Sequence, residues 1–145
     1  MFLSIIIPCY NVASFLPRTI AGLKDLKDAD DVEFIFINDG SADNTLQLIQ
    51  HFAQDDARVR VINQDNQGVS TARNNALAIA KGDFLLCLDG DDFIESSTVA
   101  TIRRYCQDCD ILMAPVNIVT EQSSVKQTLN IPYGEHQKKY AELEK

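Results

Sequence analysis

The sequence predicts an α/β fold, an α/β/α sandwich around a mostly parallel central sheet. Between residues 3 and 106, short apolar runs alternate four times with amphipathic stretches of helical period. Unbroken apolar runs are typical of parallel strands buried on both faces, and right-handed crossovers place the intervening helices on both sides. With 145 residues, the chain can form one domain that buries about two-thirds of its unfolded surface. We therefore expect a single domain over residues 1–145.

Four strand–helix pairs are predicted in succession, with no repeat, low-complexity segment or linker between them. The strands are expected at 3–7, 32–37, 59–62 and 84–88, and the helices at about 14–26, 44–54, 70–80 and 96–106. Pro8 closes the first strand, and Pro17 is compatible with the first helix because it falls in the first turn. The buried stripe of that helix is expected to contain Phe15, Leu16, Ile20, Leu23 and Leu26.

The remaining residues predict a different arrangement. Strands over 110–119 and 125–131 are expected to pair as a hairpin. Pro132 and Gly134 then break the chain before a polar final helix over about 135–145.

The stretch from Phe84 to Asp92 carries the strongest functional signal. Five apolar residues predict a central strand, and Asp89, Asp91 and Asp92 follow at its carboxyl end, where open α/β sheets bind ligands. Two carboxylates about 5 Å apart repel by roughly 3 kcal/mol at an effective dielectric constant near 20. A divalent cation reverses that repulsion, and acidic oxygen ligands suit Mg²⁺ or Mn²⁺. We predict a metal or ligand role for Asp89 and Asp91. For Asp92, a helix cap with Glu95 as its capping-box partner is the alternative.

Polar residues also follow the first strand. The run Pro8-Cys9-Tyr10-Asn11 begins where that strand ends. Tyr10 is suited to stack on a flat ring, and Asn11 is suited to read a hydrogen-bonding edge. The alternative interpretation is a turn with a partly buried tyrosine.

Asp39-Gly40-Ser41 ends the second strand in the same way. Asp39 is suited to accept a hydrogen bond from a base N–H or a ribose hydroxyl, while Gly40 lets a ligand approach the backbone. Turn chemistry, with Ser41 or Asp43 capping the next helix, is the alternative.

The segment from Gly68 to Asn74 opens the third helix and contains Arg73 in its first turn. The helix dipole disfavours a cation there. An arginine at this position is explained if it meets an acid or a phosphate oxygen. Pairing with a local aspartate and contact with a phosphate are compatible roles.

Composition excludes several classes of function. The net charge of −8 and the pI near 4.6 argue against nucleic acid or an anionic membrane as the main partner. No G-x-G-x-x-G follows the first strand and no G-x-x-x-x-G-K-[ST] occurs, which disfavours dinucleotide-binding and P-loop chemistry. The apolar start of the chain is too short for a membrane span. We expect a cytoplasmic protein, with peripheral association at the inner face of the membrane left open.

Four segments, taken in order, resemble family 2 glycosyltransferases, and the resemblance covers roughly residues 3 to 115. The segments are Ser4–Asn11, Phe36–Thr45, Gly68–Asn74 and Leu88–Asp92. The resemblance implies the Rossmann-like GT-A fold and a nucleotide-diphosphate-sugar donor, with a uridine diphosphate sugar favoured. It also implies inversion at the anomeric carbon, a saccharide or lipid-linked acceptor, and a role in cell-surface polysaccharide synthesis.

The resemblance also implies roles for individual positions. Asp39 would contact the base, Arg73 would lie near the base and phosphates, and Asp91 would hold a metal that bridges the diphosphate. The nucleotide-sugar-binding residues implied in this way are Pro8, Tyr10, Asn11, Asp39, Gly68, Arg73, Asp89 and Gly90. Mn²⁺ or Mg²⁺ would be held by Asp91 and Asp89.

Members of the family usually continue through an acceptor-binding half that supplies a carboxylate base. This sequence ends at Lys145, and nothing marks Glu121, Glu135 or Glu142 as that base. We therefore expect a truncated donor-binding part, with its general base beyond Lys145, that binds donor and metal but transfers sugar poorly or not at all.

Two other functions are compatible with parts of the pattern. A non-catalytic nucleotide-sugar-binding module would share every donor-side motif and lack only the base. A haloacid-dehalogenase-like phosphatase also has D-x-D after an apolar strand. That class requires Thr or Val where this chain has Phe93, so it is disfavoured.

Overall fold

The computed structural model describes residues 1–106, 111–113, 116–120, 123–129 and 140–142. The chain divides into two compact units, residues 1–96 and 97–145. The four motifs that suggested function all lie in the first unit. A single domain over the whole chain stays a prediction.

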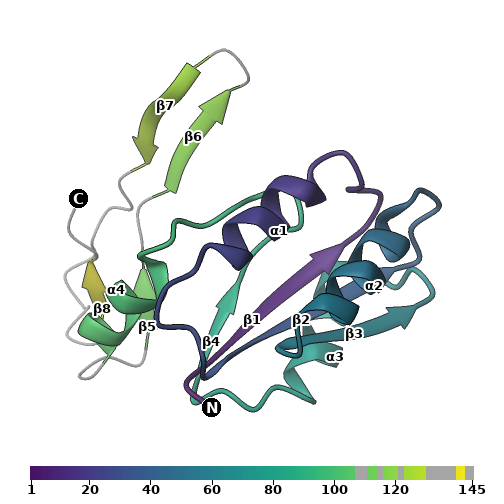
Figure 1. Cartoon of the computed structure of the whole chain (residues 1–145), viewed down its shortest axis with the longest axis horizontal. Coiled ribbons are helices and arrows are strands. Elements are labelled where there is room, and N and C mark those ends of the chain that lie inside the picture. Colours follow the sequence, from purple (N-terminus) through teal and green to yellow (C-terminus); the bar gives the residue numbers. More distant parts are fainter. Residues whose placement is uncertain (107–110, 114–115, 121–122, 130–139, 143–145) are drawn as a thin grey trace. The chain divides into compact units, whose positions relative to one another are not determined.

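The first unit is built on a parallel sheet of four strands in the order β3-β2-β1-β4 (Figure 1). The strands are β1 (Leu3–Cys9), β2 (Val32–Asp39), β3 (Val59–Gln64) and β4 (Phe84–Cys87). In the register of the sheet, Ile5 of β1 lies between Phe34 of β2 and Leu86 of β4. The predicted α/β class with a parallel sheet is confirmed.

Helices cover both faces of this sheet, as Figure 1 shows. On one face, α2 (Thr45–Asp55) places Phe52 against Phe34 and Phe36, with ring centroids 6.3 Å and 6.0 Å apart. Helix α1 (Leu16–Lys24) contacts α2 and buries Leu16 and Leu23. Because successive strand residues point to opposite faces, Ile35 and Ile37 point the other way, toward α3.

Helix α3 (Val69–Leu77) covers the second face with two small residues. Ala72 and Ala76 are fully buried in a cluster with Ile6 of β1 and Ile35 and Ile37 of β2. Small side chains allow the helix to approach the sheet closely. Its N-terminus lies beside the end of β2, because the N–H of its N-cap residue Gly68 donates to Asp39.

Strand β4 is not central, contrary to the prediction for residues 84–88. Within residues 1–96 it lies at the end of the sheet, beyond β1. Leu85 is 50% exposed and Cys87 is also exposed, although Leu88 is buried. An apolar run on both faces shows that a strand suits burial, but it does not show how many neighbours the strand has.

Strand β1 runs through Pro8 to Cys9 rather than ending before the proline. Successive residues of a strand direct their N–H groups to opposite neighbours, so Ile6 and Pro8, two residues apart, face the same neighbour. Leu88 still donates to the carbonyl of Ile6, but β4 has ended at Cys87. The pairing with β4 has therefore ended at the level of Pro8, and the N–H that proline lacks is not required for it.

Helix α1 begins later than predicted, and Phe15 precedes it as the N-cap residue with 55% of its surface exposed. The expectation that Phe15 belongs to the buried stripe was wrong. Helix α3 ends at Leu77, but Ile79 and Ala80 still pack against its cluster.

The second unit contains α4 (Thr98–Tyr105), β5 (Ile111–Met113), β6 (Val116–Thr120), β7 (Ser123–Leu129) and β8 (Tyr140–Glu142). The antiparallel pairing of β6 with β7 confirms the predicted hairpin. The strand expected at 110–119 is two strands, and β5 pairs in parallel with β8. The final helix predicted over about 135–145 is wrong at Tyr140–Glu142, which form β8. The rest of that predicted helix, residues 135–139 and 143–145, lies outside the described residues, and so does Glu121.

The alternative considered for Asp92, a helix cap with Glu95 as its capping-box partner, is wrong. Helix α4 begins at Thr98, with Ser97 as its N-cap residue. Residues 93–96 separate Asp92 from the helix and run beside α1, so Asp92 is too early to cap it. In the described part of the chain, no helix combines the length and apolar character that crossing a membrane requires.

Candidate functional site

The carboxyl ends of β1, β2 and β4 and the start of α3 are linked by side-chain contacts. The loop after β1 bonds to the loop after β2, and Asp39 at the end of β2 bonds to the loop before α3. Arg73 of α3 bonds to Asp89 after β4, and Gly90 packs against Cys9 at the end of β1. These contacts close a ring, and all four sequence motifs lie on it.

The loop after β1 is fixed by Asn11, whose φ of +53° lies in the left-handed region that asparagine tolerates. Its N–H donates to Ser41 Oγ at 3.0 Å, and its Oδ1 accepts from the N–H of Ala42 at 2.8 Å. Tyr10 precedes it with 53% of its surface exposed. The side-chain carbonyl of Asn11 thus supports the loop, while the Tyr10 ring lies at the surface.

A second pair of bonds ties the same loop to α2. Val12 N–H donates to Thr45 Oγ1 at 3.0 Å, and Ala13 N–H donates to Asp43 Oδ2 at 3.1 Å. Asp43 also accepts from the N–H of Thr45, which begins α2. The hydrogen bond from the Thr45 side chain is the main reason that the pKa of Asp43 is lowered. Asp43 thus bonds to the first residue of α2, but the N-cap residue of that helix is Asn44, so neither Ser41 nor Asp43 takes the N-cap position.

Asp39 is buried and accepts three hydrogen bonds. Oδ1 accepts from Gln64 Nε2 and from the N–H of Gln67, and Oδ2 accepts from the N–H of Gly68, all at 2.9 Å. Gly40 has a φ of +72°, and a Cβ there would lie 2.7 Å from the backbone nitrogen of Asn66. Asp39 and Gly40 thus hold the loop over 65–68 against the end of β2.

Arg73 and Asp89 form an ion pair between α3 and the segment after β4. Arg73 Nη2 lies 2.7 Å from Asp89 Oδ1, and the side chains are 36% and 52% exposed. Arg73 Nε is buried and has no hydrogen-bond partner among the described residues. The pair is monodentate, and both partners keep capacity for a further contact.

Residues 89–92 form a tight turn that contains three aspartates, and we call it the acidic turn. The N–H of Asp92 donates to the carbonyl of Asp89 at 3.0 Å. Burial raises the pKa of Asp92, and the charges of Asp91 and Asp89 raise it further. Burial, with Asp91 nearby, also raises the pKa of Cys9 to about 12. The three carboxylates therefore share one region of negative potential.

The described residues contain no group of three His, Cys, Asp or Glu side chains placed to hold a metal. Two exposed carboxylates on one turn still offer oxygen donors of the type that Mg²⁺ and Mn²⁺ prefer. Such ions commonly take one or two protein carboxylates and complete their coordination with water and substrate phosphates. Asp89 and Asp91 carry the donors that this second kind of site uses.

Sequence reasoning missed two residues that support this region. Gln64 donates to Asp39 and accepts from Asn75 Nδ2 at 2.7 Å. Thr19, buried on α1, contacts the backbone of the acidic turn. A polar residue on the buried stripe of a helix was the available signal for Thr19, since such a residue needs a partner.

The family model described as glycosyl transferase family 2 matches residues 4–143 of this chain. The chain belongs to glycosyl transferase family 2. Its relatives include the uncharacterized glycosyltransferase EpsJ of Bacillus subtilis strain 168, which is 40% identical over 94 residues. The chondroitin synthase of Pasteurella multocida strain Pm70 is 37% identical over 106 residues.

These matches cover 65% of this chain and 27% of EpsJ, and 72% of this chain and 11% of the chondroitin synthase. Among solved structures, residues 1–349 of Staphylococcus aureus TarS in complex with UDP-GlcNAc are similar, with a TM-score of 0.73 and 27% identity. That match covers 88% of this chain and 37% of the TarS chain. The family resemblance and the GT-A fold are both confirmed.

Proposed function

We propose that this family 2 chain binds a nucleotide-diphosphate sugar at the ring of strand ends, within an inverting, metal-dependent glycosyltransferase. The observation that carries the proposal is the position of Arg73 beside the acidic turn. A cation and two exposed carboxylates meet at the carboxyl end of a parallel sheet, where ligands of such sheets bind. The likeness to TarS crystallised with UDP-GlcNAc supports a uridine diphosphate sugar as the donor.

The charges suggest how the site handles a diphosphate. Asp89 and Asp91 would hold Mn²⁺ or Mg²⁺, which supplies positive charge to the departing nucleoside diphosphate. Arg73 would donate from its unused N–H groups, including the buried Nε, to a phosphate oxygen. Such donors stabilise the charge that develops as the glycosidic bond to the phosphate breaks.

The remaining contacts suit the nucleoside. The exposed ring of Tyr10 offers a surface on which a base can stack, with Asn11 directly after it and Pro8 two residues before it. Asp39 already accepts from Gln64, Gln67 and Gly68, and Oδ2 has one partner fewer than Oδ1. We propose that this oxygen accepts from the base, with Gly68 and Gly90 allowing close approach.

The chain spans 27% of the length of EpsJ and 11% of the length of the chondroitin synthase. Sugar transfer, the acceptor and the pathway are therefore part of the proposal. The relationship to a chondroitin synthase supports synthesis of a surface polysaccharide. We assign no general base, and a nucleotide-sugar-binding module without transfer activity is the alternative. Cytoplasmic location stays a prediction.

Thermal unfolding with UDP and Mn²⁺ tests the donor side. A ligand at 100 times its Kd stabilises the folded state by about 2.7 kcal/mol. For a chain of this size, that raises the Tm by roughly 5–10 °C. We expect this shift with UDP and Mn²⁺ together, and we expect Asp91→Ala to remove the metal-dependent part.

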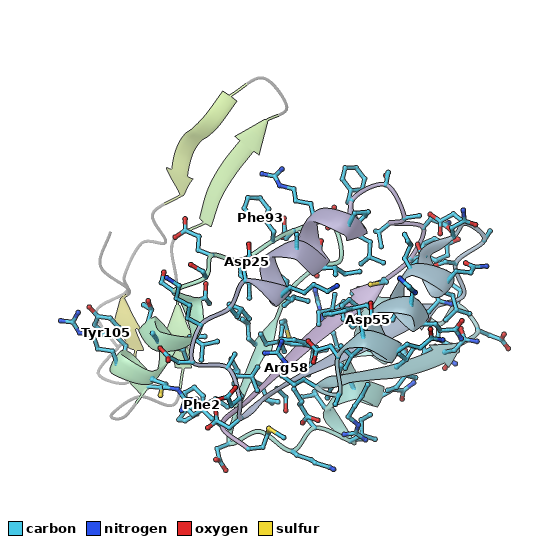
Figure 2. The ribbon with its side chains drawn as sticks, in the orientation of Figure 1. Phe2, Asp25, Asp55, Arg58, Phe93 and Tyr105 are labelled. Carbon is cyan, nitrogen blue, oxygen red and sulfur yellow. The ribbon has the colours of Figure 1, made fainter. Side chains whose placement is uncertain are left out.

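Asp55→Ala is the matched control because Asp55 is an exposed acid on α2 (Figure 2). It should keep the full metal-dependent shift. Absence of a shift in the wild type with any nucleoside diphosphate and Mn²⁺ would contradict the proposal. An assay of sugar release from UDP-sugars by this chain, and by the chain fused to further family 2 sequence, separates transferase from binding module.

A further inference from the structure

Thr19 lies on the buried face of α1 and is 1% exposed. Its hydroxyl oxygen is 2.7 Å from the carbonyl oxygen of Asp92 and 3.0 Å from that of Gly90. A hydroxyl group has one proton, so Thr19 donates to these two carbonyls in turn or shares its proton between them. Both carbonyls belong to the acidic turn, whose sequence is separated from Thr19 by more than 70 residues.

Gly90 places the same turn close to the end of β1. It is buried, and a Cβ at this position would lie 2.9 Å from Cys9 Sγ and 3.1 Å from the carbonyl oxygen of Pro8. The backbone of the turn is thus held between α1 and the end of β1. The side chains of Asp89 and Asp91 extend from this fixed backbone and are exposed.

The segment after the turn continues along α1. The Arg18 guanidinium lies 3.8 Å from the ring centroid of Phe93, and Figure 2 shows Phe93 beside this helix. One helical turn further on, a Cβ at Gly22 would lie 2.9 Å from the carbonyl oxygen of Ile94. The whole stretch is therefore aligned by α1, and Thr19 is the residue of α1 that bonds to the turn itself.

We propose that Thr19 is a positioning residue for the cation site of the acidic turn. The inference rests on the proposed function. Carboxylates bind a cation well only when their backbone is held within a few tenths of an ångström of the required geometry. Without the Thr19 hydroxyl, two carbonyls in a buried region lose their donor, and the turn shifts to reach water. Asp89 and Asp91 then move with it.

The experiment compares Thr19→Val, which keeps the shape of the side chain but lacks the hydroxyl, with Thr19→Ser, which keeps the hydroxyl. Each variant is titrated with Mn²⁺ at a fixed, saturating concentration of UDP, and the Tm is recorded. We expect Thr19→Val to raise the Mn²⁺ concentration at half-effect about tenfold, the lower end of the loss typical when support of a metal ligand is removed. Thr19→Ser should stay within about twofold of the wild type.

Thr101→Val is the matched control. Thr101 lies on α4, and its hydroxyl donates to the carbonyl of Ser97 in its own helix. It should change the Tm without metal only slightly and leave the Mn²⁺ midpoint unchanged. Free UDP binds the same amount of Mn²⁺ in every sample. The ratio of the Mn²⁺ midpoints of variant and wild type therefore reports only the change in the protein.

The outcomes separate the two proposals. If Thr19→Val lowers the Tm without metal but keeps the wild-type Mn²⁺ midpoint, Thr19 is only structural and the inference is overturned. The same holds if Thr19→Ser is as impaired as Thr19→Val. If Mn²⁺ has no effect on the wild type, the proposed metal dependence fails first, and the inference fails with it.

Discussion

Strand β2 carries a buried acid near each end, Glu33 toward its start and Asp39 at its finish, and each accepts three hydrogen bonds. Glu33 accepts from Ser4 Oγ at 2.7 Å, from the N–H of Lys81 at 2.6 Å and from Arg60 Nη1 at 3.3 Å. The partners of Asp39 are an amide side chain and two backbone N–H groups. One acid is neutralised by a cation of the fold, and the other is not.

The surroundings of the two acids differ in the same way. At the amino end, Arg60 also donates to the carbonyl of Ile79 at 2.7 Å, and Ser4 Oγ accepts from the N–H of Gly82. These bonds connect β1, β2 and β3 with the segment between α3 and β4. At the carboxyl end, Asp89 and Asp91 are exposed, Arg73 is partly exposed, and the bonding capacity of these side chains is only partly used. Charge at one end serves the fold, and charge at the other remains available for a ligand.

The largest effect is expected from Glu33→Ala. Removing the Glu33 carboxylate leaves the buried Ser4 hydroxyl and the N–H of Lys81 without their acceptor, and each buried donor left unsatisfied costs about 1–3 kcal/mol. Urea unfolding at neutral pH should show a loss of about 3 kcal/mol in the free energy of unfolding. Binding of UDP by the fraction that remains folded should be unchanged.

Glu95→Ala is the control for this variant because Glu95 is an exposed acid. It should unfold at nearly the wild-type urea concentration. A Glu33→Ala protein as stable as this control would show that the amino-end network does not hold the sheet together, and the contrast between the two ends would be lost.

A smaller effect on stability, with a larger effect on binding, is expected from Asp39→Asn. The amide keeps one acceptor oxygen, but its NH₂ group would face a backbone N–H or the Gln64 side chain. Loss of one to two such bonds costs about 1–3 kcal/mol. Because the loop over 65–68 shifts and a base contact is lost, UDP should bind about tenfold more weakly, which equals about 1.4 kcal/mol.

Calorimetric titration with UDP and Mn²⁺ measures this change, and urea unfolding measures the stability. Asn63→Ala is a matched control, since Asn63 Oδ1 accepts from Asn38 Nδ2 on the same pair of strands, and the donors to Asp39 are Gln64, Gln67 and Gly68. It should bind UDP as the wild type does. Unchanged affinity in Asp39→Asn would assign Asp39 to the fold alone, like Glu33.

The parts of the molecule that the sequence predicted well are those set by local pattern. Apolar residues predicted β1 and β2 correctly. The pattern is clear because every residue of both strands is buried, so most of them are apolar. The same reasoning misplaced β4, since Leu85 looks equally apolar in a central strand and at a sheet end. Pro8 was predicted to end β1 because a proline lacks the N–H that a strand normally needs. The sequence does not show that β4 ends at Cys87, so that this N–H is not required.

The site divides along a similar line. Asp89 and Asp91 follow a predicted strand, and Arg73 lies in the first half of a predicted helix, so their position near the carboxyl ends of the strands follows from the topology alone. Thr19 and Gln64 contribute through partners far away in sequence, and no periodicity reveals such pairs. Metal and nucleotide binding by the rim residues stays a prediction.

The smallest effect concerns pH and again separates the two ends. Burial alone would raise the pKa of Glu33, but hydrogen bonds from Ser4, the N–H of Lys81 and Arg60 outweigh it, so the pKa lies below the ordinary value of 4.5. Between these two pKa values the unfolded chain binds more protons than the folded chain. The stability that Glu33 contributes is therefore complete above about pH 4.5 and is lost as the pH falls through its folded pKa.

Glu33→Gln removes this titration and keeps an acceptor for part of the network. Urea unfolding at several pH values between about 7 and 3.5 should show that the variant loses less stability on acidification than the wild type. Some acid sensitivity should remain, because the hydrogen bond from Arg58 also lowers the pKa of Asp56. Equal losses in wild type and Glu33→Gln would mean that Glu33 protonates at the same pH in the folded and unfolded chains. Arg60 would then not stabilise the charged form of Glu33.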